Sequence, residues 1–330
     1  MANFAFFLIF FLWFRRNCLS LQQQLNFIIL NDTMKNNNFC RIMALVIGMV
    51  LCVASCEKMN ISEESSGNDG EANVYLSIGS FEQTPFTMTR RAVSDVCTRI
   101  NFLVYDRDGT RIRKLDQQLG DNGFGQASFM LAKGRYFLVV IAHSGEGNPT
   151  STNAQKIGFT NSTGFTDTFI YADSLTVADA AVNRILDLKR NVAMVRFVTY
   201  DAAPARADSI RFYYTGGSGT FDAVSGGWGV VNSTQVQWYE LTHADQQFEI
   251  YTIPHEGDDD YLKVTVSTYR GPRNDATLLS ECIIEGIPVK RNRITTCRGF
   301  LFSPVYEQKY IITIDDEWDE EGIDFYFNEE

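Results

Sequence analysis

Few residues of this chain stand in an arrangement that could carry acid–base or nucleophilic chemistry. The three histidines are His143, His243 and His255. A catalytic histidine needs a nucleophile within reach, and a metal-binding histidine needs further ligands. None of the three has such a partner at a recognisable spacing, and the sequence lacks nucleophile-elbow, phosphate-loop and dinucleotide-binding motifs. We therefore predict a protein that is not an enzyme and that uses no metal and no cofactor.

Two acidic runs and two glycine-rich runs are candidates for ion or phosphate sites. Residues 256–261 and 315–321 could offer carboxylates to calcium, but neither has EF-hand spacing, and solvated turns are the favoured interpretation. The glycine-rich residues 216–219 and 225–229 do not lead from a buried strand into a helix, as a phosphate-binding loop would. We interpret both glycine-rich runs as flexible loops.

One cysteine stands in a context that favours covalent attachment of lipid. Residues 42–55 form an apolar run of 14 residues, fewer than the roughly 20 that a membrane-spanning helix needs, and matching the apolar core of a signal peptide. Residues 53–56, Val-Ala-Ser-Cys, resemble the bacterial lipobox. This resemblance implies cleavage between Ser55 and Cys56 and a diacylglycerol on the Cys56 sulfur. The alternative is an ordinary secretory signal.

The start of the native protein is expected at Met34, which is followed by the basic residues Lys35 and Arg41. Residues 4–14 form a second apolar run that is too short to span a membrane. Two signal-like runs in tandem are unusual, so we interpret the upstream stretch as non-native, with an unusual leader as the alternative. Residues 1–55 are thus leader and signal peptide, and the polar residues 56–73 form a tether.

The charge of the mature chain excludes some partners. Removing residues 1–55 removes four basic residues and one acidic residue, so the net charge changes from −11 to −14 over the remaining 275 residues. Such a chain is an unlikely partner for nucleic acid or for anionic lipid. The lipid on Cys56 would therefore have to hold the protein on the membrane. Of the other mature cysteines, Cys282 and Cys297 could pair, or could be two small buried apolar side chains.

Alternating apolar and polar residues indicate that the chain after the tether is almost entirely β. Residues 99–105 alternate in this way and are followed by the turn sequence Asp-Arg-Asp-Gly, which predicts a hairpin with residues 110–118. A second hairpin is predicted over residues 125–144. Within it, residues 136–142 are nearly continuously apolar, as expected of a central strand that is covered on both faces.

The next segments complete an all-β prediction. Residues 145–181 are rich in Gly, Asn, Ser and Thr and are interpreted as loop. Residues 185–201 regain strand character, with a short helix over residues 177–186 as the alternative. Residues 208–217 and 258–270 are similar to residues 98–109 and 132–144, in the same order, which suggests two similar β domains in tandem. We place these domains at residues 74–195 and 196–330, each as a β-sandwich.

Taken in order, these segments resemble a known family. The matching segments are the lipobox, the polar tether, Thr-Met-Thr-Arg-Arg-Ala-Val at residues 87–93, the strand sequences at 100–112 and 131–143, and Asn-Arg-Ile-Thr-Thr-Cys-Arg-Gly-Phe-Leu-Phe at 292–302. They are similar, in this order, to the FimB-like anchor and minor subunits of Bacteroidales type V pili. The resemblance covers roughly residues 43–330 and rests on strand-and-turn phrases without a diagnostic motif.

The resemblance implies a fold and a function. The fold would be two tandem transthyretin-like β-sandwich domains, and the protein would be a lipid-anchored, surface-exposed component of the outer membrane and the fimbrium. Its partners would be other pilus subunits, joined by β-strand exchange. Shaft subunits of the family are cut by an arginine-specific protease, and Arg90 and Arg91 lie in the corresponding region. If they are cut, Cys56 is lost; if they are not, the protein remains an anchor or accessory subunit, which we favour.

The last strand pattern supplies candidates for exchange. Residues 310–314 are Tyr-Ile-Ile-Thr-Ile and have high β propensity. On one face of such a strand, Tyr310, Ile312 and Ile314 would enter the pockets of a neighbouring subunit. The same strand could instead close its own sandwich.

A protein of a different class remains as the alternative. Tandem β-sandwiches on a lipid tether also suit a glycan-binding surface lipoprotein of a polysaccharide-capture system. Exposed coplanar aromatic rings on one face would favour that function, and Trp228 and Trp238 are the candidates, although tryptophan in a sandwich more often packs in the core.

Overall fold

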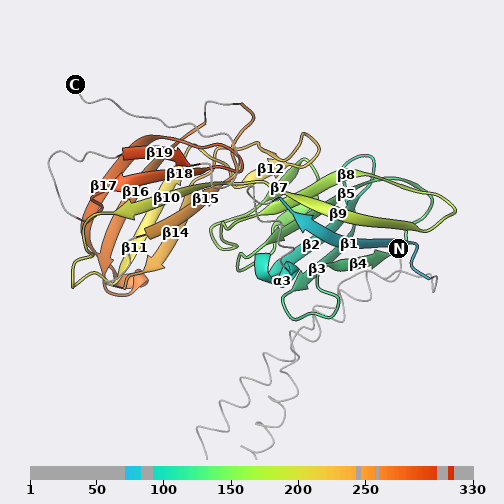
Figure 1. Cartoon of the computed structure of the whole chain (residues 1–330), viewed down its shortest axis with the longest axis horizontal. Helices are drawn as coiled ribbons and strands as arrows, with labels where there is room; N and C mark the ends of the chain where they lie inside the picture. The colour runs from blue at the N-terminus through green and yellow to red at the C-terminus, as the bar shows by residue number, and fades with distance from the viewer. Residues whose placement is uncertain (1–70, 83–91, 243–246, 258–259, 303–310, 316–330) are drawn as a thin grey trace, which may run out of the picture. The chain divides into compact units, whose positions relative to one another are not determined.

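The computed structural model describes residues 71–82, 92–242, 247–257, 260–302 and 311–315. The regular structure of these residues is almost entirely β-strand (Figure 1). The helical elements among them are one α-helical turn, α3 (Val93–Val96), and one 3-10 turn, η1 (Arg273–Asp275). The prediction of an all-β protein is confirmed.

Seven strands of the N-terminal half form one hydrogen-bonded sheet in the order β3-β2-β5-β8-β9-β1-β4. They are β1 (Val74–Phe81), β2 (Arg99–Tyr105), β3 (Arg111–Gln118), β4 (Gln126–Phe129), β5 (Gly134–His143), β8 (Phe169–Val177) and β9 (Val182–Arg190). The strands β8 and β9 pair only through Phe169 with Arg190 and Ile170 with Lys189. Beyond that short contact, β9-β1-β4 and β3-β2-β5-β8 form the two layers of a sandwich around a shared core.

The first core joins side chains from both layers. Phe102 of β2 and Leu138 of β5 are fully buried in the same cluster as Val74 of β1 and Leu186 of β9. Each strand contributes alternate residues, because successive side chains of a β-strand point to opposite faces. Burying such side chains contributes roughly 1.5–3 kcal/mol each. The alternation seen in the sequence therefore has its physical origin in this core.

The first predicted hairpin is confirmed and the second is wrong. The strands β2 and β3 are antiparallel neighbours, and the Asp106 carboxylate closes their turn by accepting hydrogen bonds from the amides of Asp108 and Thr110 at 3.0 and 2.9 Å. In contrast, β4 pairs with β1, and β5 pairs with β2 and β8. The chain between β4 and β5 thus crosses from one layer to the other, because the apolar face of β4 is buried beside β1.

The strand β5 is covered on both faces, as predicted. Leu138 and Val140 enter the first core, whereas Val139 and Ile141 enter a second cluster on the opposite face. The segment predicted as loop, residues 145–181, contains the short strands β6 (Thr150–Asn153) and β7 (Lys156–Gly158) and the long strand β8. The short helix considered over residues 177–186 is also wrong, because β9 begins at Val182.

The C-terminal half contains two four-stranded sheets, in the orders β15-β10-β18-β19 and β14-β11-β16-β17. Their strands are β10 (Ala193–Thr199), β11 (Ser209–Thr215), β14 (Gln235–Glu240), β15 (Gln247–Thr252), β16 (Tyr261–Arg270), β17 (Thr277–Pro288), β18 (Ile294–Gly299) and β19 (Ile311–Asp315). Phe197, Phe212 and Phe248 lie in the core between them. Cys282 and Cys297 are buried thiols of this core and form no disulfide.

The strands of the two halves follow corresponding orders. In the first half, β1 lies between antiparallel β4 and parallel β9; in the second, β10 lies between antiparallel β15 and parallel β18. The order β3-β2-β5-β8 likewise corresponds to β14-β11-β16-β17. The segments with similar sequence, residues 98–109 and 208–217, contain β2 and β11, which occupy corresponding positions. The strand β10 spans the expected domain boundary at residue 195 and pairs with later strands.

A third sheet links the two halves through the backbone. It has the order β13-β12-β7-β6, with β12 (Thr220–Asp222) and β13 (Trp228–Gly229) contributed by the second half. The pairing of Phe221 with Ile157 brings the two halves together. Both side chains are fully buried, in the cluster that also covers the second face of β5.

Candidate strand-exchange site

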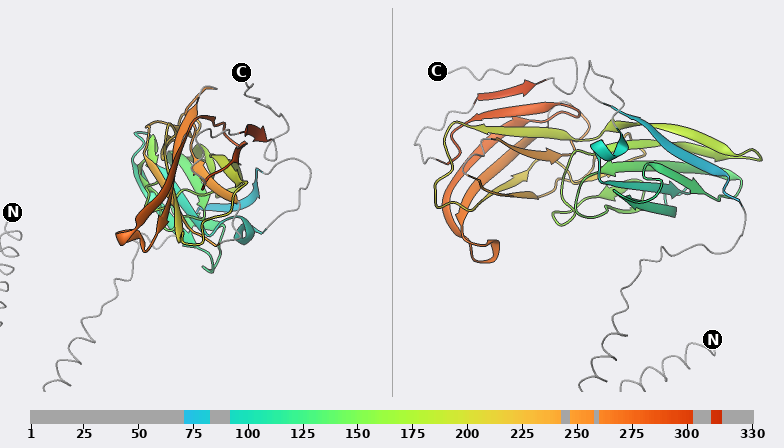
Figure 2. Two further views of the ribbon diagram at one scale, coloured as in Figure 1. Left: turned by 90° about the vertical axis from the view of Figure 1, so that its left-hand side faces the viewer. Right: turned by 60° about the horizontal axis from the view of Figure 1, so that its bottom comes forward.

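The first strand of the fold lies in the interior of its sheet. The strand β1, drawn in blue in Figure 2, is antiparallel to β4, with Val74 opposite Phe129, and parallel to β9, with Val74 opposite Val182. Its backbone therefore forms hydrogen bonds on both sides. If β1 were removed, the unpaired edges of β4 and β9 would face each other across a gap one strand wide, which is the geometry that an added strand requires.

The inner face of β1 supplies apolar side chains to the core. Val74 and Leu76 are 0% and 3% exposed, and Ile78 and Phe81 pack partly buried against the same cluster. The ring of Phe81 meets that of Phe169 edge-on at 5.1 Å between centroids. A replacement strand would have to present apolar residues at the same alternate positions.

The outer face of β1 borders a groove of about 840 Å³. Its lining includes Tyr75 of β1, Leu115 of β3, Gln126 of β4 and Ile185 of β9. Ile185 is 75% exposed. Exposed apolar side chains therefore lie beside the outer face of β1.

Both ends of β1 are held by side-chain hydrogen bonds. Just before β1, the Asn73 amide accepts from the Leu131 backbone N–H at 2.9 Å and donates to the Leu131 carbonyl at 2.8 Å. Just after it, the Glu82 carboxylate accepts from the Arg190 backbone N–H at 2.9 Å. The Arg190 guanidinium in turn forms two hydrogen bonds to Asp167, at 2.8 and 2.9 Å. The sequence did not point to these residues, since the partners in these contacts lie 23 to 108 positions apart.

The C-terminal candidate strand is β19. It pairs antiparallel with β18, with Ile312 opposite Cys297, and Ile312 is 6% exposed in the second core. Within the described residues, β19 is an edge strand of its own sheet. Tyr310 and the side chain of Ile314 lie outside the described part, so the exchange role of Tyr310, Ile312 and Ile314 stays a prediction.

The remaining candidates at the N-terminal side lie outside the described residues. These are Ser55 and Cys56 at the expected lipid site, and Arg90 and Arg91 at the expected protease site. In the part of the chain that is described, no helix is long and apolar enough to cross a membrane. Lipid attachment and cleavage therefore stay predictions.

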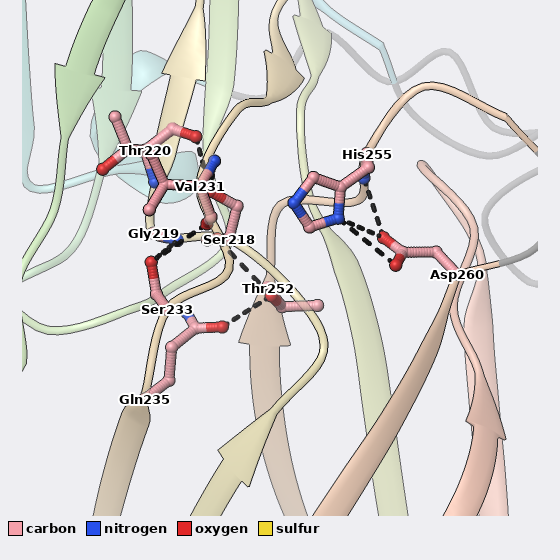
Figure 3. Close-up of polar contacts among 9 residues, drawn as sticks. All are labelled: Ser218, Gly219, Thr220, Val231, Ser233, Gln235, Thr252, His255 and Asp260. Carbon is pink, nitrogen blue, oxygen red and sulfur yellow. Dashed lines mark hydrogen bonds and ion pairs between the residues drawn. The ribbon is translucent and has the colours of Figure 1, made fainter.

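The described histidines occupy structural positions. His143 is fully buried, its ring lies 3.2 Å from the Asn101 side-chain oxygen, and burial lowers its pKa to about 4. Asn101 also donates to Asp116 at 2.8 Å. His255 contacts Asp260 at 3.0 Å (Figure 3). His243 lies outside the described residues, and among those described no group of three potential metal ligands occurs.

The glycine-rich residues 216–219 form a tightly packed turn at the junction of the two halves. Ser218 is fully buried and its hydroxyl donates to the Thr220 carbonyl at 2.6 Å, while Thr252 donates to the Gln235 side chain at 2.6 Å (Figure 3). A Cβ on Gly217 would lie 2.0 Å from the Thr252 hydroxyl. The glycines thus permit close packing of backbone against side chains, and the interpretation of this run as a flexible loop is wrong.

Trp228 and Trp238, the tryptophans among the described residues, do not form a flat platform for sugars. Trp228 stacks against the Arg291 guanidinium, at 3.5 Å from its ring centroid. Trp238 contacts Tyr269 at 5.2 Å with an angle of 38° between the rings, and Arg211 lies 5.8 Å from the Trp238 centroid. Coplanar exposed rings, which would favour the glycan-binding alternative, are not seen at these two positions.

Comparison with known proteins places most of the chain in a family without an assigned function. The model of the family of unknown function DUF6562 matches residues 149–329. No curated protein matches the sequence.

Several solved structures are similar at low identity. The fimbrial anchor protein Mfa2 from Porphyromonas gingivalis has 11% identity and a TM-score of 0.39, covering 73% of this chain and 95% of that one. A candidate adhesin from Bacteroides thetaiotaomicron has 15% identity and a TM-score of 0.44, covering 76% and 98%. Candidate polysaccharide-binding proteins (DUF1812) from the same species have 10% identity and a TM-score of 0.46, covering 75% and 97%.

Proposed function

The chain belongs to the family of unknown function DUF6562, and we propose that it is a non-enzymatic fimbrial subunit that assembles by β-strand exchange. The observation that carries this proposal is the position of β1, which is hydrogen-bonded on both sides and buries Val74 and Leu76. Such a strand is the kind of element that exchange can replace, because a new strand would recover both sets of backbone hydrogen bonds and the buried apolar area.

Within this class we propose the role of outer-membrane anchor or accessory subunit. The polar residues 56–73 connect Cys56 directly to β1. A lipid on Cys56 would then be attached to a strand that two neighbours and a core hold in place. In this role β1 is retained, and the C-terminal strand with Tyr310, Ile312 and Ile314, which pairs with β18 in the monomer, leaves that position and is donated to the next subunit.

The N-terminus of the mature protein distinguishes the possible roles. Cleavage after Arg91 would separate β1 and Cys56 from the rest of the chain, leaving β1 held by non-covalent contacts alone. An anchor should carry an acylated Cys56 at its N-terminus, whereas a shaft or tip subunit should begin at Ala92. Mass spectrometry of the protein isolated from cells decides between these outcomes.

Association with fibres tests strand exchange itself. Cells producing the full chain are compared with cells producing Ile312→Asp, and with Ile283→Asp as the control, since Ile283 is a half-exposed strand residue of the same half. Provided that circular dichroism shows a folded protein, we expect Ile312→Asp to lose association with sheared fibres and to remain in the membrane fraction, and Ile283→Asp to behave as the wild type. Recovery of bound polysaccharide without fibres would instead support a glycan-binding lipoprotein.

A further inference from the structure

A pocket of about 520 Å³ is lined by residues outside β1 and β19, although Asp187 in its wall accepts a hydrogen bond from Ser80 of β1. Its wall is formed by the strands β8 and β9, the turn of residues 223–226, and Arg291. The volume falls in the range of about 300–1,000 Å³ that is usual for small-molecule sites. The lining combines the aromatic rings of Phe137 and Tyr171 with several charged and amide side chains.

The guanidinium of Arg291 is fixed in this pocket with one edge unused. It stacks on the Trp228 ring at 3.5 Å, and its Nη1 donates to the Gly226 carbonyl at 2.8 Å. The Nε and Nη2 atoms are buried and have no hydrogen-bond partner in the protein. These two atoms form the edge of an arginine that binds a carboxylate through two parallel hydrogen bonds.

A second buried polar group lines the same pocket. Asn191 is 0% exposed, and both its side-chain oxygen and its side-chain nitrogen lack a partner in the protein. An unsatisfied buried polar group costs about 1–3 kcal/mol. Asn191 can accept one hydrogen bond and donate two, which suits a hydroxyl group, because a hydroxyl both donates and accepts.

The charges of the pocket leave it favourable to an anion. Asp173 is paired with Arg184 at 3.2 Å, and the Asp187 carboxylate accepts a hydrogen bond from Ser80. The remaining cations of the lining are Lys189 and Arg291, in addition to Arg190 with its carboxylate partner Asp167. A partly buried arginine without a hydrogen-bonded anion is costly, and burial lowers the Arg291 pKa to about 10 although the Glu82 carboxylate nearby acts to raise it. An anionic ligand would relieve that cost.

We propose that this pocket binds an acidic sugar, with the carboxylate on the Nε–Nη2 edge of Arg291 and a neighbouring hydroxyl on Asn191. A sugar fits better than a peptide carboxylate for two reasons. Sugar hydroxyls can form hydrogen bonds with both unpartnered atoms of the Asn191 side chain, and Phe137 and Tyr171 offer apolar surface to a sugar ring. The polar atoms are covered in this structure, so entry requires a shift of the turn at residues 223–226. Val224 in that turn is 51% exposed.

Calorimetric titration of the full chain tests the proposal. The probes are digalacturonic acid, the neutral disaccharide of galactose, and a tripeptide with a free C-terminus. We expect digalacturonic acid to bind at least tenfold more tightly than either of the other probes. The variant Arg291→Lys keeps the charge and loses the planar edge, and should weaken binding at least tenfold. Arg206→Lys is the matched control at an exposed arginine and should bind as the wild type.

Each other outcome overturns the assignment. Absence of binding, or equal binding of the acidic and neutral disaccharides, would rule out a carboxylate on the Arg291 edge. Preference for the tripeptide would assign the pocket to a peptide C-terminus. If Arg291→Lys does not fold, as judged by circular dichroism, Asn191→Leu replaces it and should also lose binding. Fibre association should be unchanged in either variant, so this proposal and strand exchange fail independently.

Discussion

Replacing Ile312 with alanine should destabilise the second sandwich measurably. Ile312 is 6% exposed, lies opposite Cys297 across the β18–β19 pair, and belongs to the same buried cluster as Phe197 and Phe212. The substitution removes buried methyl and methylene groups and leaves a cavity, because the surrounding side chains relax only partly. It does not alter the backbone hydrogen bonds of β19.

The magnitude follows from the burial of this side chain. Isoleucine-to-alanine changes in cores cost about 2–5 kcal/mol, and the position of β19 at a sheet edge places the expected loss near 2–3 kcal/mol. For a unit of this size, 1 kcal/mol corresponds to roughly 2–4 °C in melting temperature. The expected decrease is therefore about 4–12 °C. By comparison, Ile283→Ala at a half-exposed position should cost less than about 1 kcal/mol.

Urea unfolding of the two variants and the wild type provides the assay. A lower midpoint with an unchanged m-value for Ile312→Ala, and a small change for Ile283→Ala, would show that β19 closes its own sheet in the monomer. Equal and small effects of both substitutions would refute this reasoning, since β19 would then not contribute to the monomer core. In that case, loss of fibre association by Ile312→Asp would mean that the strand acts only in a neighbouring subunit.

Three further predictions concern other parts of the chain. His143 titrates with a pKa of about 4 when folded and 6.5 when unfolded, so the unfolded chain binds more protons than the folded chain between these pH values. The free energy of unfolding should therefore fall by roughly 3 kcal/mol as the pH decreases from 6.5 to 4. A His143→Gln variant whose stability has the same pH dependence as the wild type would contradict this. Cys56→Ala should prevent incorporation of radiolabelled palmitate, and continued labelling would place the lipid elsewhere. Far-UV circular dichroism of the mature chain should show little helix, and a helix content above about one-third would be incompatible with the fold.

Local patterns were sufficient where the interacting groups are close in sequence. The β2–β3 hairpin follows from the turn around Asp106, whose carboxylate binds amides only two and four residues away. The coverage of β5 on both faces follows from its continuous apolar run, because a strand with apolar residues on both sides must be buried on both. The absence of long helical periods likewise predicted an all-β protein.

Partner choice between distant strands could not be predicted in this way. The strand β4 was expected to pair with β5 and pairs with β1, because the backbone groups of any strand can pair with any other and only the closed core selects the neighbour. The glycines of residues 216–219 have a sequence typical of a loop. Their close packing depends on Thr252, about 35 positions later, which lies against Gly217.

The sequence by itself determined the alternation of the strands, the hairpin turn and the acidic charge of this protein, because each depends on residues that are neighbours in the chain. Only the tertiary structure decided that β1 lies between β4 and β9 and that Asn191 and Arg291, a hundred residues apart, line one pocket. The position of β1 and the lining of the pocket both depend on apolar surface that segments far apart in the sequence bury together. That shared burial exists only when the whole core has formed.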